Sequence, residues 1–95
     1  MHVFGSISIH TSFLRRTDLT LNEKVVFSLL RYFKKVFPND LITSKDIAKQ
    51  LGLSITTVDN TLKKLEAKNL IDIKMIYHKN TKIALGKQIT LNINW

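Results

Sequence analysis

Residues 44–70 read SKDIAKQLGLSITTVDNTLKKLEAKNL, a pattern of two short helices separated by a single glycine. The first helix is predicted over residues 43–51, with Thr43 or Ser44 as its N-cap. Gly52 follows directly, at the position where a residue with left-handed backbone commonly ends a helix.

The second helix is predicted over residues 54–69 and begins at Ser54, a residue type that suits an N-cap. Apolar residues at spacings of three and four form a narrow core stripe: Ile55, Val58, Leu62 and Leu65. The opposite face is predicted to carry short polar and basic side chains: Thr56, Thr57, Asn60, Thr61, Lys63 and Lys64. Because threonine is a poor helix former, three threonines in one helix have no evident reason in stability.

A longer helix is predicted upstream, over residues 20–37. Thr20 and Glu23 form a capping box, in which each side chain bonds the backbone N–H of the other residue. Apolar residues then recur with a helical period: Leu21, Val25, Val26, Leu29, Leu30, Phe33, Val36 and Phe37. Pro38 disfavours helical backbone at the preceding residue, so the helix is expected to end there.

Residues 1–17 show a weaker pattern. The apolar residues of one parity are Val3, Ile7 and Ile9. This alternation is compatible with a short N-terminal strand or an extended arm. One helical turn is expected at residues 12–14, ahead of the basic pair Arg15 and Arg16.

Residues 70–95 change to an alternation of period two, which predicts a β-hairpin with one buried face. One strand has its apolar residues at Ile71, Ile73, Met75 and Tyr77, and the other at Ile89, Leu91, Ile93 and Trp95. The connection is expected within residues 78–87, with Asn80 and Gly86 as turn candidates.

Composition restricts the class of protein. The 95 residues are enough for a single domain, over residues 1–95, and 44% hydrophobic content is ordinary for a globular chain. Lys and Arg total 15 against 7 acidic residues, and the net charge of +8 indicates a polyanionic partner. The absence of cysteine excludes a disulfide framework and a thiol nucleophile. Neither a membrane span nor a secretory signal is found, so we expect a cytoplasmic protein with no membrane partner.

Neither catalysis nor metal binding is predicted. His2, His10 and His78 are isolated, with no carboxylate pattern beside them that would complete a metal site. The sequence also lacks a Ser/His/Asp or paired-carboxylate arrangement with a supporting framework. We therefore expect a non-enzymatic protein with no cofactor and no metal.

The order of helix, glycine turn, helix and hairpin resembles the helix-turn-helix of bacterial winged-helix DNA-binding proteins. The matching features are Ile47-Ala48, Leu51-Gly52-Leu53, Ser54, Thr57-Val58 and Leu62-x-x-Leu65-x-x-x-Asn69-Leu70-Ile71. The resemblance implies an α+β fold of three helices and a C-terminal hairpin, the wing. It also implies that the second helix of the pair enters the major groove of DNA.

The resemblance continues upstream. The segments Ile9-His10-Thr11-Ser12-Phe13-Leu14, Asp18-Leu19-Thr20 and Glu23-Lys24-Val25 are similar to the N-terminal winged-helix domain of plasmid and phage replication proteins and replisome organisers of low-GC Gram-positive bacteria. This similarity implies a role in replication or maintenance of a mobile element.

Candidate contacts to DNA follow from side-chain chemistry. Asn60 suits a bidentate bond to adenine, and threonine offers a hydroxyl to bases or phosphates and a methyl group to thymine. The predicted DNA-contacting residues are Ser54, Thr56, Thr57, Asn60, Thr61, Lys63, Lys64, Lys45, Arg15, Arg16, Lys74, Lys79 and Lys82.

Other interpretations of these residues stay open. The polar helix face is also compatible with a solvated surface, and the hairpin lysines Lys74, Lys79, Lys82 and Lys87 with protection of an exposed sheet edge. Arg15 and Arg16 fit phosphate contacts and ordinary surface charges equally well. Asp59 is unexpected beside phosphates. It either accepts a bond from cytosine, pairs with Lys63, or lies off the interface.

The leading hypothesis is a sequence-specific, double-stranded DNA-binding protein that acts in transcription regulation or in replication of a phage or plasmid. One small module buries little area on DNA, so we expect a homodimer. The candidate dimer surfaces are the N-terminal arm, the helix face around Phe27 and the Trp95 end. The alternative is a winged helix that binds single-stranded DNA or a replication protein.

Overall fold

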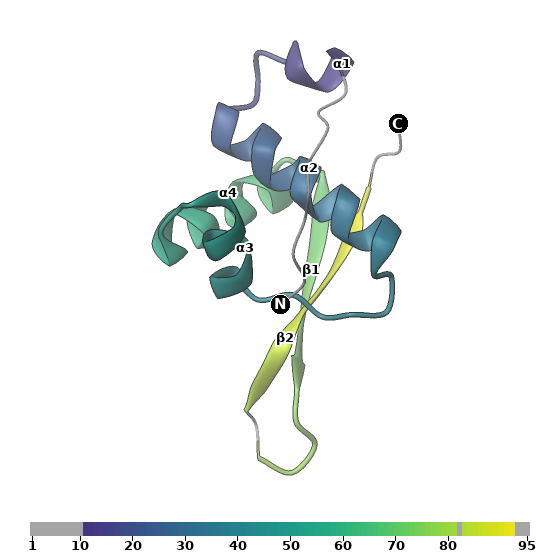
Figure 1. The fold of residues 1–95 in the computed structure, drawn as a ribbon. Helices are drawn as coiled ribbons and strands as arrows, with labels where there is room; N and C mark the ends of the chain where they lie inside the picture. The colour runs from purple at the N-terminus through teal and green to yellow at the C-terminus, as the bar shows by residue number, and fades with distance from the viewer. Residues whose placement is uncertain (1–10, 82, 93–95) are drawn as a thin grey trace.

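The computed structural model describes residues 11–81 and 83–92. Its elements are α1 (Thr11–Leu14), α2 (Leu21–Val36), α3 (Ser44–Leu51), α4 (Ile55–Ala67), β1 (Ile71–Tyr77) and β2 (Ala84–Leu91) (Figure 1). Helices followed by an antiparallel hairpin confirm the predicted winged-helix fold class, and α1 occupies the site of the expected helical turn. The expected strand around Val3–Ile9 and the residues Ile93 and Trp95 lie outside the described residues.

Side-chain caps begin the three long helices. At α2 the capping box forms as predicted: Thr20 Oγ1 accepts from the Glu23 N–H at 3.2 Å, and the Glu23 carboxylate accepts from the Thr20 N–H at 3.4 Å. Of the two cap candidates for α3, Thr43 is the cap, because its Oγ1 accepts from the Asp46 N–H at 3.1 Å. Ser54 caps α4 by accepting from the Thr57 N–H at 3.0 Å.

Left-handed residues end α3 and α4. Gly52 has φ +68°, and the following N–H, that of Leu53, donates to the Ala48 carbonyl. Asn69 has φ +60°, an uncommon value for a non-glycine residue. Its own N–H donates to the Glu66 carbonyl, and the Leu70 N–H donates to the Leu65 carbonyl. These are the two bonds of a Schellman motif, which turns the chain from α4 into β1.

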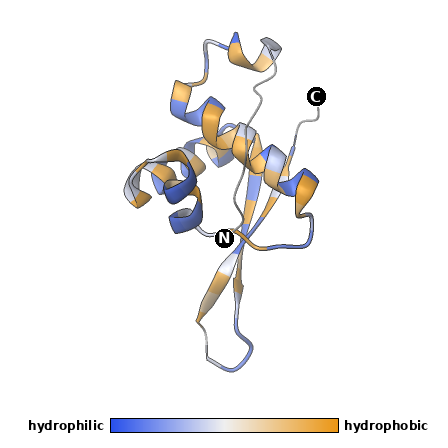
Figure 2. Ribbon diagram, viewed as in Figure 1, coloured by the Kyte–Doolittle hydropathy of each residue, from blue (hydrophilic) through white to orange (hydrophobic). Residues whose placement is uncertain are grey.

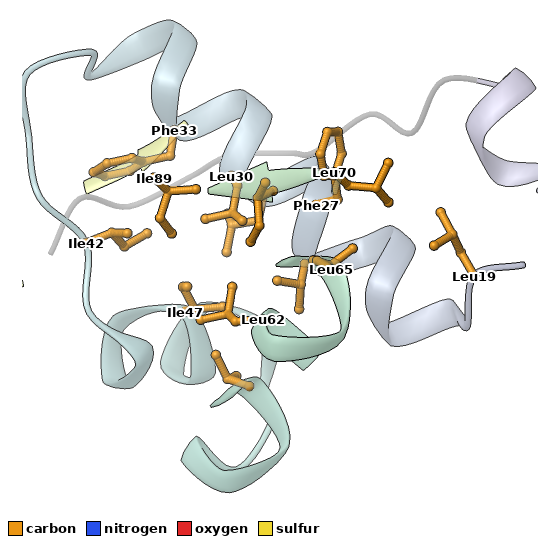
Figure 3. Packing of buried hydrophobic residues seen from close by; sticks show 14 of the residues in the cluster. Leu19, Phe27, Leu30, Phe33, Ile42, Ile47, Leu62, Leu65, Leu70 and Ile89 are labelled. Carbon is orange, nitrogen blue, oxygen red and sulfur yellow. The ribbon is translucent and has the colours of Figure 1, made fainter. Parts of the chain in front are cut away.

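The core lies where α2 crosses α3, α4 and the base of the hairpin (Figures 1 and 3). Its fully or nearly buried members are Phe13, Leu19, Val26, Phe27, Leu29, Leu30, Phe33, Ile42, Ile47, Ala48, Val58, Leu62, Leu65, Leu70, Ile71 and Ile89. Figure 2 shows hydrophobic and hydrophilic residues alternating along the helices. No helix in residues 11–81 or 83–92 has the length and apolar character needed to cross a membrane.

Several sequence-based placements are wrong, among them those of Phe27, Ile55 and Thr61. Phe27 is 0% exposed and packs against Phe13 with ring centroids 4.9 Å apart, so it offers no surface for a dimer. Ile55 is 48% exposed and does not join the core stripe of α4. Thr61 is only 5% exposed, and its hydroxyl donates to the Thr57 carbonyl at 2.7 Å. Helical periodicity places a residue on a face to within a fraction of a turn, so positions at the edge of a stripe are decided by the neighbouring elements.

The hairpin pairs in one antiparallel register, from Ile71 opposite Leu91 to Ile76 opposite Gly86. A bulge at Leu85 then brings Tyr77 opposite Ala84. Asn80 lies in the connecting turn, as predicted, whereas Gly86 lies within β2 and is not a turn residue.

Gly86 is the place where a third chain segment approaches the hairpin. Ile42 forms an isolated bridge with Lys87: each N–H donates to the other carbonyl, at 3.2 and 2.7 Å. A Cβ atom on Gly86 would lie 2.9 Å from the Cβ of Leu41, and Gly86 has φ +152°, a value that side chains disfavour. Only glycine therefore allows segment 41–42 to dock on β2.

One carboxylate is buried in the helical body. Glu23 is 1% exposed, and its Oε2 accepts from Lys68 Nζ at 2.6 Å. Burial alone would raise the pKa of Glu23, but the hydrogen bonds from Lys68 and Thr20 outweigh it and hold the pKa below the ordinary value. Lys68 also donates to the Asp18 carbonyl, so it ties the end of α4 to the start of α2.

We predict that Gly86→Ala lowers the free energy of unfolding by about 2–3 kcal/mol, because it combines an unfavourable φ with a close contact to Leu41. Urea unfolding followed by circular dichroism measures the change. Gly52→Asn is the matched control, since asparagine tolerates φ near +68° and nothing lies within 4 Å of that site. An equal loss in both variants would contradict the role assigned to the Gly86 contact.

We predict a pH-dependent contribution to stability from Glu23. The folded-state pKa of Glu23 lies below the ordinary value of 4.5. The stabilisation that Glu23 contributes is therefore present above pH 4.5 and is lost as the pH falls through the folded-state pKa. The free energy of unfolding should therefore fall less steeply from about pH 5 to pH 3 in Glu23→Gln than in the wild type. Asp72→Asn, which removes an exposed carboxylate, is the control. If the free energy of unfolding of Glu23→Gln falls as steeply with pH as that of the wild type, the role assigned to Glu23 is refuted.

Candidate nucleic-acid interface

The outer face of α4 carries the central group of predicted contacts. Thr56, Asn60, Lys63 and Lys64 are all exposed. Asn60 follows Thr56 by four residues, and Lys63 and Lys64 follow Asn60 by three and four, so all four share one side of the helix. The structure therefore brings together an amide, a hydroxyl and two ammonium groups on a single convex surface.

The first turn of α4 is fixed by hydroxyl bonds. The Ser54 hydroxyl accepts from the Thr57 N–H and donates to Thr57 Oγ1 at 2.7 Å. Thr57 is half-buried and Ser54 is exposed. These two predicted residues are thus engaged in shaping the helix start, and Thr61, which was predicted on the same face, is buried beneath it.

Ile55 is a candidate contact that sequence reasoning missed. It was assigned to the core because it continues the spacing of Val58 and Leu62. In the structure it is exposed at the first position of α4, beside Thr56. An apolar side chain there suits contact with a thymine methyl group. Its position directly after the N-cap Ser54 could have indicated its exposure, because the first residue of a helix often lies outside the core.

The hairpin presents its positive charge along its length. Lys74 and Lys79 are exposed, on β1 and in the turn respectively, and no acidic residue follows Asp72 in the sequence. Lys82, also predicted to contact DNA, lies outside the described residues. Lys87 differs from Lys74 and Lys79, because it is half-buried and its Nζ donates to Ser44 Oγ at 2.9 Å.

Asp59 does not face outward with the basic residues of α4. Its carboxylate accepts a short hydrogen bond from the hydroxyl of Ser44, at the start of α3. Of the three interpretations of Asp59, this placement favours the one in which it lies off the outer face. With Lys87 it lines an open groove of about 320 Å³ between α4 and the hairpin, whose other lining residues are Leu62, Lys63, Glu66 and Ile73.

The remaining predicted cations are Lys45, Arg15 and Arg16. Lys45 is exposed near the start of α3. Arg15 is exposed, but Arg16 forms a bidentate pair with Asp18, at 3.0 and 2.6 Å, and stacks over the ring of Phe13. The hydrogen bond between Arg16 and Asp18 raises the pKa of the guanidinium and lowers that of the carboxyl.

The position of Arg16 can be related to α4 through Lys68. Lys68 is the C-cap of α4 and donates to the carbonyl of Asp18. The ion pair between Arg16 and Asp18 therefore lies at the C-terminal end of that helix. The 13 residues of α4 extend roughly 20 Å. The structure therefore does not bring Arg16 together with Ser54 and Thr56 at the helix start.

No group of three or more metal-ligating side chains occurs in the part of the chain that the structure describes. His78 is exposed at the end of β1, while His2 and His10 lie outside the described residues.

Comparisons with known proteins agree with this geometry. A family model described as winged helix-turn-helix DNA-binding matches residues 24–72. The structure of Staphylococcus aureus MepR in complex with DNA is similar, with 30% sequence identity and a TM-score of 0.60, over 85% of this chain and 52% of that one. S. aureus MepR bound to ethidium bromide is similar at 28% identity, with the same TM-score and the same coverage.

The chain spans about half the length of the MepR chains that it matches. A search of curated proteins gives no match. The family model covers more than half of the sequence and includes all of α3 and α4. This chain therefore belongs to the winged helix-turn-helix DNA-binding family.

Proposed function

We propose that this protein binds double-stranded DNA sequence-specifically, with α4 in the major groove and the hairpin on the adjacent backbone. The observation that carries the proposal is the outer face of α4, where Thr56, Asn60, Lys63 and Lys64 are exposed while the one acid in the first half of the helix, Asp59, is bonded to α3. A helix surface without free acids is suited to a polyanion.

Base recognition is assigned to the first half of α4. The Asn60 amide provides a donor and an acceptor, the pair of groups that recognises adenine in the major groove. Thr56 and Ile55 offer methyl groups that suit thymine. Ser54 and Thr57 act mainly by holding the start of the helix in the conformation that presents these side chains.

Backbone binding is assigned to lysines on three elements: Lys45 on α3, Lys63 and Lys64 on α4, and Lys74 and Lys79 on the hairpin. Contacts of this kind supply affinity and orientation but no sequence information. Arg15 and Arg16 are left out of this interface, because the Arg16 guanidinium is paired with Asp18 at the opposite end of α4.

We propose further that the protein works as a homodimer in the regulation of transcription. A single small module buries only about 600–1,000 Å² of protein surface on DNA, and two modules are usually needed for tight specific binding. The similarity to MepR in complex with DNA supports DNA binding as the activity. A role in replication of a phage or plasmid stays a prediction from the sequence.

The first test is fluorescence anisotropy with a labelled random-sequence duplex and the matched single strand, across a salt series. Duplex binding that weakens steeply with salt would support the proposal, and selection from a random pool would then give the preferred site. A preference for the single strand, or no binding at low salt, would refute it and favour the alternative of a single-strand or protein-binding winged helix.

We predict different effects for two exposed residues once the site is known. Asn60→Ala should relax the preference at one base pair by about 1–3 kcal/mol, because one bidentate contact is lost. Lys79→Ala should weaken binding to all sequences alike and reduce the magnitude of the salt slope by about one. Both are measured by titration against the selected site and its single-base variants. Uniform loss in Asn60→Ala would refute base reading by that residue.

We predict that Arg16→Ala leaves duplex affinity within about twofold of the wild type, since its charge is already paired with Asp18. The same titration series measures it, with Lys64→Ala as the matched removal of one exposed cation on α4. A loss in Arg16→Ala as large as that in Lys64→Ala would place the N-terminal arginines in the interface after all.

A further inference from the structure

Three side chains from three elements form a continuous hydrogen-bonded chain. Lys87 Nζ on β2 donates to Ser44 Oγ at 2.9 Å, and the Ser44 hydroxyl donates to the Asp59 carboxylate on α4. The serine hydroxyl therefore lies between an ammonium and a carboxylate and links them. Ser44 is buried, and the other two side chains are half-buried. Hydrogen bonds in such a chain polarise and strengthen one another.

The backbone of Lys87 is held at the same place. Its N–H and carbonyl both pair with Ile42, two residues before Ser44. One residue of the hairpin is thus fixed to the helical body through its main chain and its side chain. The side-chain bond spans 43 positions in the sequence and reaches Ser44 at the start of α3. Ser44 in turn bonds Asp59 on α4, the helix that is proposed to enter the major groove.

Beyond this level the hairpin extends away from the helices (Figure 1). We call residues 75–81 and 83–85 the wing tip. Its large apolar side chains are well exposed: Met75 37%, Tyr77 54%, Ile83 63% and Leu85 52%. Residues at the base of the same strands, Ile71 and Ile89, are buried in the core. Lys87 therefore lies at the boundary between the anchored and the projecting parts of the hairpin.

We propose that Lys87, Ser44 and Asp59 form a wing clamp, a set of positioning residues that fixes the angle of the hairpin to α4 and thereby allows both to contact DNA together. This inference rests on the proposed function, since it concerns how the same interface is held. None of the three residues needs to touch DNA for the clamp to act.

The geometry makes the angle at the clamp important. Met75 pairs with Lys87, and Asn80 in the turn lies five positions further along the chain, a length of at most about 17 Å. A tilt of about 10° at the clamp would displace the turn by roughly 3 Å, a shift about as large as the donor–acceptor distance of a hydrogen bond. A lysine at the turn would lose its phosphate contact.

The clean test is Ser44→Ala, which removes the linking hydroxyl and leaves every charge in place. Ser28→Ala is the matched control, because Ser28 is also buried and its hydroxyl donates to the Lys24 carbonyl within α2, away from the hairpin. We expect Ser44→Ala to weaken duplex binding about tenfold. We also expect it to reduce the magnitude of the salt slope by about one, as the phosphate contact of Lys79 is lost. Ser28→Ala should leave both quantities unchanged.

A distance measurement tests the clamp without DNA. The chain has no native cysteine, so spin labels can be placed at Thr81→Cys in the turn and Asn22→Cys on α2, both exposed sites. Pulsed electron resonance on labelled chain diluted with excess unlabelled chain should give a narrow distance distribution in the wild type. The distribution should broaden or shift in Ser44→Ala and stay narrow in Ser28→Ala.

The outcomes separate the two proposals. Weaker binding with a broadened distance distribution supports the clamp, whereas weaker binding with an unchanged distribution overturns it. An unchanged affinity in Ser44→Ala also overturns it. If the wild type fails to bind duplex, the proposed function is lost, and the label distances alone decide whether these residues hold the hairpin.

A second variant pair distinguishes positioning from charge neutralisation. Lys87→Met removes the cation and leaves Asp59 uncompensated near the proposed DNA surface. If the role of Lys87 were only to neutralise that charge, adding Asp59→Asn would restore duplex affinity, and the clamp would be refuted. The clamp requires that the double variant bind as weakly as Lys87→Met alone, because both lack the bond to Ser44.

Discussion

The apolar stripe of α4 is the contact on which the rest of the molecule depends. Val58, Leu62 and Leu65 are almost completely buried against α2 and α3. Because so narrow a stripe is enough to hold the helix, about two thirds of its circumference remains outside the core. That surface is where the exposed polar and basic side chains gather. The Schellman turn at Asn69 then directs the chain from this helix into the hairpin, so the placement of α4 also sets the start of the wing.

Several acids of this protein are bonded within the chain, whereas many of its lysines are exposed to solvent. Three of its acids, Asp18, Glu23 and Asp59, accept hydrogen bonds from the chain itself. Two of these bonds come from basic side chains at one end of α4, and the third comes from a serine that in turn binds Lys87. Lys63 and Lys64 on α4 and Lys74 and Lys79 on the hairpin are left exposed to solvent. Internal pairing thus increases the positive character of the proposed DNA surface beyond what the net charge of +8 expresses.

The features that could be predicted from the sequence are those whose cause is local. The caps at Thr20 and Ser54 bond residues three positions away, and Gly52 directly ends its helix, so a short window of sequence contains the whole interaction. The outward placement of Thr56, Asn60, Lys63 and Lys64 on α4 was predicted for the same reason. Ile55 and Thr61 were misplaced because packing of other elements decides positions at the edge of a stripe. The bond from Lys87 to Ser44 joins residues 43 positions apart, and nothing in either neighbourhood indicates it.

The long-range attachment of the hairpin has a consequence for the order of folding. Contacts within the helix-turn-helix close short loops, whereas docking of β2 on segment 41–44 closes a loop of more than 40 residues and requires the hairpin to have formed. We therefore expect the helices to assemble first and the hairpin to dock last. During synthesis, α2, α3 and α4 leave the ribosome before β2 does, so the newly made chain passes through a stage in which Ile42 and the base of the core lack the contacts that β2 provides.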